Sequence, residues 1–298
     1  MSPMFRGVFP AIITPFKDDG SLDEDGLRRN VEVLSKTGIS GVVPCGTTGE
    51  SATLSHEEHK KVVEIVVDCS DVPVVAGTGS NNTSEAIELT RHAADAGADA
   101  ALLITPYYNR PNERGLFEHF RKVAESSDIP IVLYNVPKRT GVELRPDVVA
   151  RLSEISNIVA IKEASGSLTQ VSRIIELTAD KNFAVLSGDD DLTLPMLALG
   201  ATGVVSVVAN VAPRATVEMV NAFLDGNITR AQELHYRLAP LVRAMFLETN
   251  PIPVKTAYRM LGMAAGPLRL PLAPMSDENE AKLRDVLTKM SDLTGDMR

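Results

Sequence analysis

The chain has 298 residues, of which 44% are hydrophobic and 23% charged, close to the globular average, so disorder and coiled coil are excluded as the main organisation. The formal net charge of −9 argues against a general nucleic-acid-binding protein, because such a surface is basic. No apolar run approaches the roughly 20 residues that span a bilayer and the N-terminus lacks a signal-peptide pattern, so we expect a cytoplasmic protein.

Short apolar or β-branched runs recur along the chain at intervals of roughly 20 to 35 residues. They predict eight strands: GVFPAII, GVVPCG, PVVAGTG, AALLITP, PIVLYNVP, IVAIKEAS, FAVLSGDD and GVVSVVAN. Between the strands, helical spacing and start signals predict helices over residues 22–36, 55–68, 83–96, 111–126, 146–156 and 168–179.

Strands that are apolar on both faces and alternate with helices predict a parallel sheet covered by helices. Eight such units within residues 1–224 predict an α/β fold of the (β/α)8 TIM-barrel type, with its chemistry at the C-terminal ends of the strands. An open doubly wound sheet is the alternative, but no G-x-G-x-x-G follows the first strand.

The strand pattern stops in the C-terminal region, residues 225–298, which we expect to be a helical extension. Its predicted helices cover residues 229–247, 253–261 and 277–292, with a Pro-rich loop at 267–276. The two cysteines, Cys45 and Cys69, form no disulfide or metal pattern, and we expect both thiols to be buried in apolar segments.

The second predicted strand runs into the loop GTTGES, residues 46–51, and Ser55 and Glu58 have the spacing of a capping box that opens the next helix. The glycines permit a tight turn in which the amides of Thr47 and Thr48 can converge on an anion, and the two hydroxyls can pass protons. The alternative is a plain glycine turn.

Tyrosines lie at the ends of two further predicted strands. Tyr107 and Tyr108 follow the fourth strand, and Tyr134 lies in the fifth, ahead of Arg139. These hydroxyls can extend a proton relay, and Arg139 can bind a substrate carboxylate. Each residue also has a plain interpretation, as an amphipathic tyrosine at an interface or as a solvated surface charge.

Lys162 interrupts the apolar sixth strand. Because side chains alternate along a strand, it shares one face with Ala160 and Ala164, whereas Glu163 points the opposite way. A free lysine amine has a pKa of about 10.4, and desolvation lowers the pKa of a buried one, so a buried lysine can attack a carbonyl and form a Schiff base. The alternative is a structural lysine paired with Asp189 or Asp190.

The seventh strand ends in Asp189, Asp190 and Asp191, where barrels of this kind often bind phosphate. Because three carboxylates repel phosphate, we expect a carboxylate-bearing substrate without a phosphoryl group. The aspartates can instead be a helix cap.

Eight motifs in order along the chain resemble the pyruvate-dependent Schiff-base aldolase and lyase family typified by dihydrodipicolinate synthase. They begin at residues 46, 76, 105, 134, 161, 186, 203 and 249: GTTGES, AGTGSN, TPYYNRP, YNVPKRTG, IKEASG, LSGDD, GVVSVVAN and TNPIPVK. The resemblance implies a lyase in which pyruvate forms an imine and then adds to L-aspartate 4-semialdehyde, in the biosynthesis of diaminopimelate and lysine. It implies no cofactor and a homotetramer built as a dimer of dimers.

The same resemblance implies a role for each site residue. Lys162 carries the imine, and the proton relay falls on Thr47, Tyr134 and Tyr108, the last of these from a neighbouring subunit. Thr48 binds the pyruvate carboxylate with Thr47, Arg139 takes the carboxylate of the second substrate, and the site is lined by Gly188 and the carbonyl of Val205. N-acetylneuraminate lyases and 2-keto-3-deoxy acid aldolases of the family are the alternative activity, although the paired threonines and Arg139 favour the synthase.

Two histidines in SHEEH, His56 and His59, lie three residues apart on one helical face. As a metal pair they lack a third ligand and the H-E-x-x-H spacing. The resemblance implies instead an allosteric site for the inhibitor L-lysine, with Glu85 facing its α-ammonium group. The implied residues are Ser51, Ala52, His56, His59, Asn81, Glu85 and Tyr107. A barrel without catalytic activity that serves as a binding or regulatory protein stays open as an alternative of another class.

Overall fold

The computed structural model describes residues 5–297, and the chain divides into two compact units. The first unit holds Val75–Val205 together with the N-terminal residues up to Arg6. The second joins Gly7–Val74 to Ser206–Arg298, so it includes both early helices and the C-terminal region. The predicted boundary between residues 224 and 225 stays a prediction.

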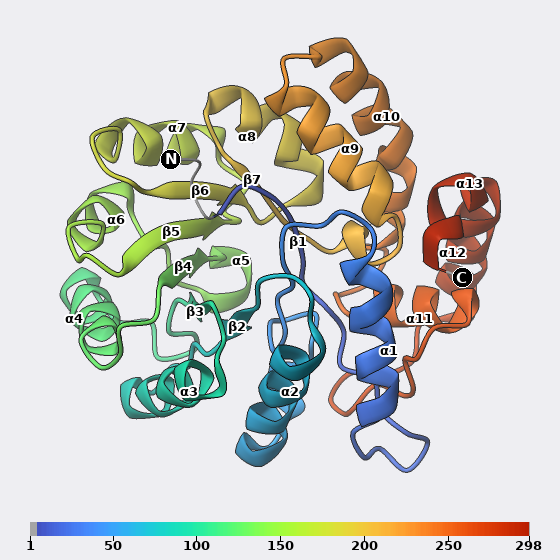
Figure 1. The fold of residues 1–298 in the computed structure, drawn as a ribbon, viewed down its shortest axis with the longest axis horizontal. Helices are drawn as coiled ribbons and strands as arrows, with labels where there is room; N and C mark the ends of the chain where they lie inside the picture. Colours follow the sequence, from blue (N-terminus) through green and yellow to red (C-terminus); the bar gives the residue numbers. More distant parts are fainter. Residues whose placement is uncertain (1–4, 298) are drawn as a thin grey trace. The chain divides into compact units, whose positions relative to one another are not determined.

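The first unit is built on parallel strands that pair in chain order. The strands are β2 (Val75–Gly77), β3 (Ala100–Ile104), β4 (Ile131–Asn135), β5 (Ile158–Glu163), β6 (Ala184–Ser187) and β7 (Gly203–Ser206). The helices are α3 (Thr83–Ala96), α4 (Glu113–Ala124), α5 (Pro137–Thr140), α6 (Pro146–Leu152), α7 (Leu168–Leu177) and α8 (Thr193–Leu199). In Figure 1, α3, α4, α6 and α7 lie outside the strands.

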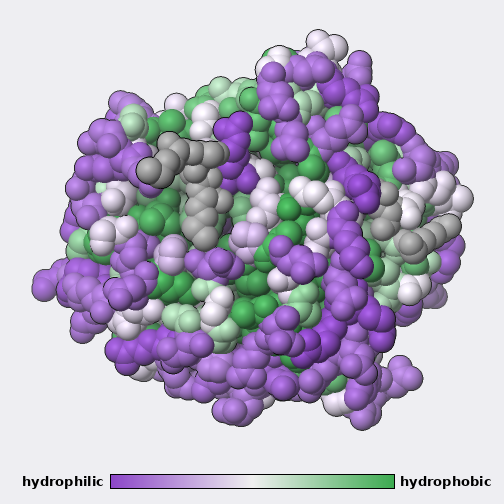
Figure 2. Space-filling view, in the orientation of Figure 1, coloured by the Kyte–Doolittle hydropathy of each residue, from purple (hydrophilic) through white to green (hydrophobic). Residues whose placement is uncertain are grey.

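Local signals explain where these helices begin and why they face the sheet. Asn82, Asn112 and Ser167 each accept a backbone hydrogen bond at the start of α3, α4 and α7, respectively. The inner faces of the helices bury apolar side chains such as Phe120 and Ile174 against the strands. The surface over α3 and α4 is mostly hydrophilic in Figure 2, as expected for amphipathic helices whose apolar side is buried.

The second unit begins with β1 (Gly7–Pro10) and contains most of the C-terminal helices. Its helices are α1 (Glu24–Ser35), the 3₁₀ turn η1 (Ser51–Thr53), α2 (His56–Cys69), α9 (Pro213–Leu224), α10 (Ile228–Ala244), α11 (Ile252–Leu261), α12 (Asp277–Lys289) and α13 (Ser291–Thr294). The amide of Ala11 donates to the carbonyl of Ser206, the last residue of β7, at 2.9 Å. The predicted Pro-rich segment 267–276 is a loop.

The second predicted strand is reduced to two parallel bridges, Val43 with Ala11 and Val42 with Val74. Pro44 follows directly and has no N–H, so the hydrogen-bonded ladder cannot continue through it. The position in the sequence was predicted correctly, but its classification as a full strand was wrong.

The short helix α5, directly after β4, was not predicted, whereas α8 and α9 complete the seventh and eighth predicted β-α units, for which no helix bounds were predicted. The thiol of Cys45 is buried as expected. Cys69, at the end of α2, is only half-buried, so the prediction of a buried thiol at Cys69 was wrong.

Over residues 5–297, no helix is both long and apolar enough to cross a membrane.

Candidate active site

Lys162 and Tyr134 lie side by side in the first unit. They are register partners on the neighbouring strands β5 and β4, and both are buried, at 7% and 6% exposure. The Lys162 Nζ lies 4.2 Å from the centre of the Tyr134 ring. This arrangement places an amine against a phenol in a largely desolvated position, which is what a nucleophilic lysine with a neighbouring proton-transfer group requires.

Small residues surround the Lys162 side chain, as the alternation of the strand predicted. Ala160 and Ala164 are buried on its face. Gly188 follows β6 and is closely packed, because a Cβ built there would lie 2.7 Å from the Ala164 Cβ and 3.1 Å from the Lys162 Cε. Val205 is buried in the neighbouring β7. The absence of a side chain at Gly188 is therefore what allows the Lys162 side chain to lie so close to the end of β6.

The acidic end of β6 lies within the electrostatic field of this lysine. Burial, together with the Asp191 carboxylate, raises the pKa of Asp189 to about 6, while Lys138 and Lys162 act against the rise. No ion pair between Lys162 and an aspartate is formed among the residues that the structure describes. The interpretation of Lys162 as half of a structural salt bridge is therefore not favoured.

Glu163 points away from Lys162, as predicted, into a buried polar network. Its carboxylate accepts hydrogen bonds from Asn135 Nδ2 at 2.9 Å, the Ser165 amide at 2.7 Å and Gln170 Nε2 at 3.3 Å. Asn135 in turn accepts the Leu144 amide at 2.9 Å. Because Asn135 and Glu163 directly follow Tyr134 and Lys162, this network links the ends of the two strands. Sequence reasoning did not identify it.

Other predicted residues of the first unit are exposed. Arg139 lies on the short helix α5 and Tyr108 is 90% exposed, with a left-handed φ of 70°. A nearly fully exposed tyrosine on a strained backbone is a feature that often marks a functional position.

In the second unit, the GTTGES loop is held by polar contacts. Thr48 is buried and its Oγ1 accepts a hydrogen bond from Asn250 Nδ2 at 3.0 Å. The carbonyl of Gly49 accepts one from Thr14 Oγ1 at 2.7 Å. Thr47 is half-buried. The capping box at Ser55 and Glu58 is present, as predicted.

A model of the dihydrodipicolinate synthetase family matches residues 4–290. The chain belongs to this family. It is 58% identical to a 4-hydroxy-tetrahydrodipicolinate synthase from Methanosarcina mazei (96% of this chain, 99% of the relative) and 59% identical to one from Methanocaldococcus jannaschii (95% and 98%).

Solved structures agree with the family assignment. A dihydrodipicolinate synthase from Aquifex aeolicus superposes with a TM-score of 0.94 at 51% identity, over 97% of this chain and 99% of that one. A structure of the family enzyme from Cyanidioschyzon merolae with lysine bound has a TM-score of 0.94 at 41% identity, over 97% and 99%. The predicted fold, a (β/α)8 barrel with a C-terminal helical extension, is confirmed.

The residues predicted for L-lysine divide between the two units. In the first, Asn81 Nδ2 donates to the Tyr107 carbonyl at 3.2 Å, and the Glu85 carboxylate accepts a hydrogen bond from Ser80. Burial raises the pKa of Tyr107, and the Glu85 charge adds to the rise. In the second unit, Ser51 and Ala52 form part of η1, whereas His56 and His59 begin α2. His56 is exposed, whereas His59 is buried.

Proposed function

We propose that this protein is a 4-hydroxy-tetrahydrodipicolinate synthase, a lyase that condenses pyruvate with L-aspartate 4-semialdehyde through an imine on Lys162. The observation that carries the proposal is the buried Lys162 amine, 4.2 Å from the Tyr134 ring, in a chain of this family. The two relatives described above are named for the synthase and not for N-acetylneuraminate lyase or an aldolase, so neither alternative is favoured.

The proposed chemistry begins at the Lys162 amine. The amine adds to the keto carbon of pyruvate, and loss of water gives the imine. Loss of a methyl proton gives the enamine, whose carbon adds to the aldehyde carbon of the second substrate while the aldehyde oxygen takes a proton. The amino group of that substrate then attacks the imine carbon, closes the ring and displaces Lys162.

Proton transfer in these steps is assigned to Tyr134, Thr47 and Tyr108. The contact between Tyr134 and the lysine amine supports the first assignment. The 90% exposure of Tyr108 supports its contribution to the site of another copy of the chain. Substrate binding is assigned to Thr48 for the pyruvate carboxylate and to Arg139 for the second carboxylate, with Gly188 and the carbonyl of Val205 lining the site.

Because Tyr108 is assigned to a neighbouring subunit, the active form is at least a dimer, and the family resemblance favours a cytoplasmic homotetramer. Sedimentation of the active enzyme over a range of concentrations tests this proposal. A monomer that retains full turnover would contradict the role of Tyr108.

The second part of the proposal is feedback inhibition by L-lysine, the end product of the pathway. A related enzyme has been solved with lysine bound, and this chain carries all seven residues predicted for that ligand. The carboxylate of Glu85 is an acceptor for an ammonium group. Titration of turnover with L-lysine, with D-lysine as the control, tests it. Unchanged turnover at millimolar L-lysine would contradict the proposal.

Trapping of the imine tests the catalytic proposal. Incubation with pyruvate and borohydride is expected to add one reduced pyruvate to Lys162, detected by peptide mass spectrometry. Lys162→Ala is expected to abolish the adduct and turnover while retaining the fold, whereas the control Lys138→Ala, at an exposed lysine of the same unit, keeps the adduct. Turnover of pyruvate with aspartate semialdehyde, compared with cleavage of sialic acid, separates synthase from lyase.

A further inference from the structure

The C-terminal part of the chain holds the GTTGES loop through two buried polar side chains. Asn250 donates to the Thr48 hydroxyl at 3.0 Å, and Lys255, on α11, donates to Glu50 Oε1 at 2.6 Å. These contacts join residues separated by 202 and 205 positions in the sequence. The loop that carries both candidate threonines is therefore fixed from outside its own stretch of chain.

Glu50 is the residue at which the loop turns. Its φ is +53°, a left-handed conformation that residues other than glycine rarely adopt and that persists only where surrounding contacts enforce it. Its amide donates to the Thr47 carbonyl at 3.1 Å. This hydrogen bond links the backbone of Thr47 to the turn at Glu50.

The contacts that enforce this conformation come from the Glu50 side chain, which is fully buried. Lys255, at 2% side-chain exposure, pairs with one carboxylate oxygen, and the Arg269 amide donates to the other at 3.1 Å. The Lys255 ammonium also donates to the Pro267 carbonyl at 2.9 Å and lies 4.2 Å from the centre of the Phe16 ring. Every polar contact of the pair is therefore made inside the protein.

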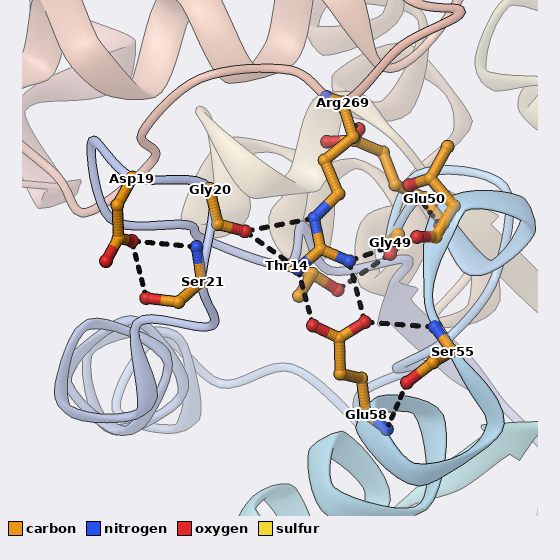
Figure 3. A network of polar contacts seen from close by, with 10 residues as sticks. Thr14, Asp19, Gly20, Ser21, Gly49, Glu50, Ser55, Glu58 and Arg269 are labelled. Atoms are coloured by element: carbon orange, nitrogen blue, oxygen red, sulfur yellow. Dashed lines mark hydrogen bonds and ion pairs between the residues drawn. The ribbon is translucent and has the colours of Figure 1, made fainter.

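A neighbouring ion pair offers a natural comparison. The Arg269 guanidinium makes a two-pronged contact with Glu58, at 2.5 and 2.7 Å, and also donates to the carbonyls of Gly20 and Thr53 (Figure 3). Glu58 lies in the first turn of α2, beyond η1. Its side chain accepts hydrogen bonds from the Ser55 amide and from Arg269, and neither Thr47 nor Thr48 takes part in these contacts. The two pairs meet at Arg269, whose amide contacts Glu50, but their side chains hold different segments. Glu50 and Lys255 hold the loop, whereas Glu58 and the Arg269 guanidinium hold the start of α2.

A buried ion pair is weak support for stability, because the desolvation of both charges opposes their attraction. Its directional hydrogen bonds, however, specify one orientation of the chain. We propose that Glu50 and Lys255 are positioning residues for the reaction: the pair fixes the left-handed turn that presents Thr47 and Thr48 to pyruvate. This inference rests on the roles proposed above for the two threonines.

The test compares Glu50→Gln, Lys255→Met and the double variant with the control Glu58→Gln, which makes the same chemical change in the neighbouring pair. Kinetics are expressed per folded molecule, with folding followed by circular dichroism and urea unfolding. For the variants of the Glu50–Lys255 pair we expect the KM for pyruvate to rise and kcat to fall, together lowering kcat/KM about tenfold or more. Glu58→Gln is expected to change neither constant.

The double variant separates positioning from stability, because it leaves no unpaired buried charge and is expected to fold even where Lys255→Met does not. A folded double variant with the KM and kcat of the wild type would overturn the inference, as would an equal kinetic loss in Glu58→Gln. A wild-type enzyme that forms no pyruvate adduct and no product would instead refute the proposed function, so the two failures are distinguishable.

Discussion

Replacement of Glu58 by Gln should make the protein less stable in a way that depends on pH. The hydrogen bonds from Arg269 lower the pKa of the Glu58 carboxyl from 4.5 to about 2, with smaller contributions from Ser55. A lowering of roughly 2.5 pKa units corresponds to about 3 kcal/mol between the charged and neutral forms. Because the Glu58 side chain is 30% exposed, solvent screening reduces the expected effect to about 1 to 2 kcal/mol.

The sign follows from the lowered pKa in the folded state. The stabilisation is complete above the unfolded pKa of 4.5 and is lost as the pH falls toward about 2. The difference in unfolding free energy between wild type and Glu58→Gln should therefore be largest near about pH 6 and shrink to roughly half or less near about pH 3. Gln can still serve in the capping box, so the substitution removes mainly the charge.

Urea unfolding of both proteins across this pH range measures the difference. Glu57→Gln is the matched control, since Glu57 lies in the same helical turn but is 89% exposed and forms only a long ion pair with Lys60, at 4.0 Å, among the residues that the structure describes. It should change stability by less than about 0.5 kcal/mol at every pH. A difference between wild type and Glu58→Gln that does not vary with pH would refute the assignment of the effect to the charged pair.

Four further substitutions test the packing and charge of the two units. Gly266→Ala should destabilise the protein by about 3 kcal/mol or more in urea unfolding, because its φ is +67° and a Cβ would lie 1.6 Å from the Phe16 carbonyl oxygen. Gly20→Ala, with φ +81° but open space around it, should cost only about 1 kcal/mol, and equal costs would contradict this reasoning. Gly188→Ala should slow borohydride-trapped adduct formation about tenfold, since its Cβ would crowd Lys162; an unchanged rate would show that the space is not needed. Burial raises the pKa of Asp189 from 3.8 to about 6 because it disfavours the charged carboxylate, so stability is retained below about pH 3.8 and is lost as the pH rises to about 6. Asp189→Asn should remove that part of the pH dependence of the melting temperature, and identical profiles would contradict it.

Patterns with local causes were predictable from the sequence. The alternation in IVAIKEASG correctly placed Lys162 among alanines and Glu163 on the opposite face, and the capping box at Ser55 and Glu58 formed as expected. The length of the second strand was overestimated, because the prediction did not consider that Pro44 interrupts the hydrogen-bonded ladder.

Contacts between distant segments were not predictable in the same way. The local sequence predicts only that Lys255 lies in a short amphipathic helix. No residue near it in the chain indicates that its ion-pair partner is Glu50. The network of Glu163 with Asn135 was missed for a similar reason: alternation gives the direction of a side chain but not the identity of its neighbours.

The long separation between Lys255 and Glu50 also has a consequence for biosynthesis of the protein. A chain made from its N-terminus exposes GTTGES roughly 200 residues before Asn250, Lys255 and Arg269 leave the ribosome, at about 5 to 20 residues per second. Until then the Glu50 carboxylate lacks the Lys255 ammonium as its ion-pair partner, and burial of an unpaired charge is strongly unfavourable. The loop that we assign to catalysis is therefore expected to reach its final conformation only after nearly all of the chain has been synthesised.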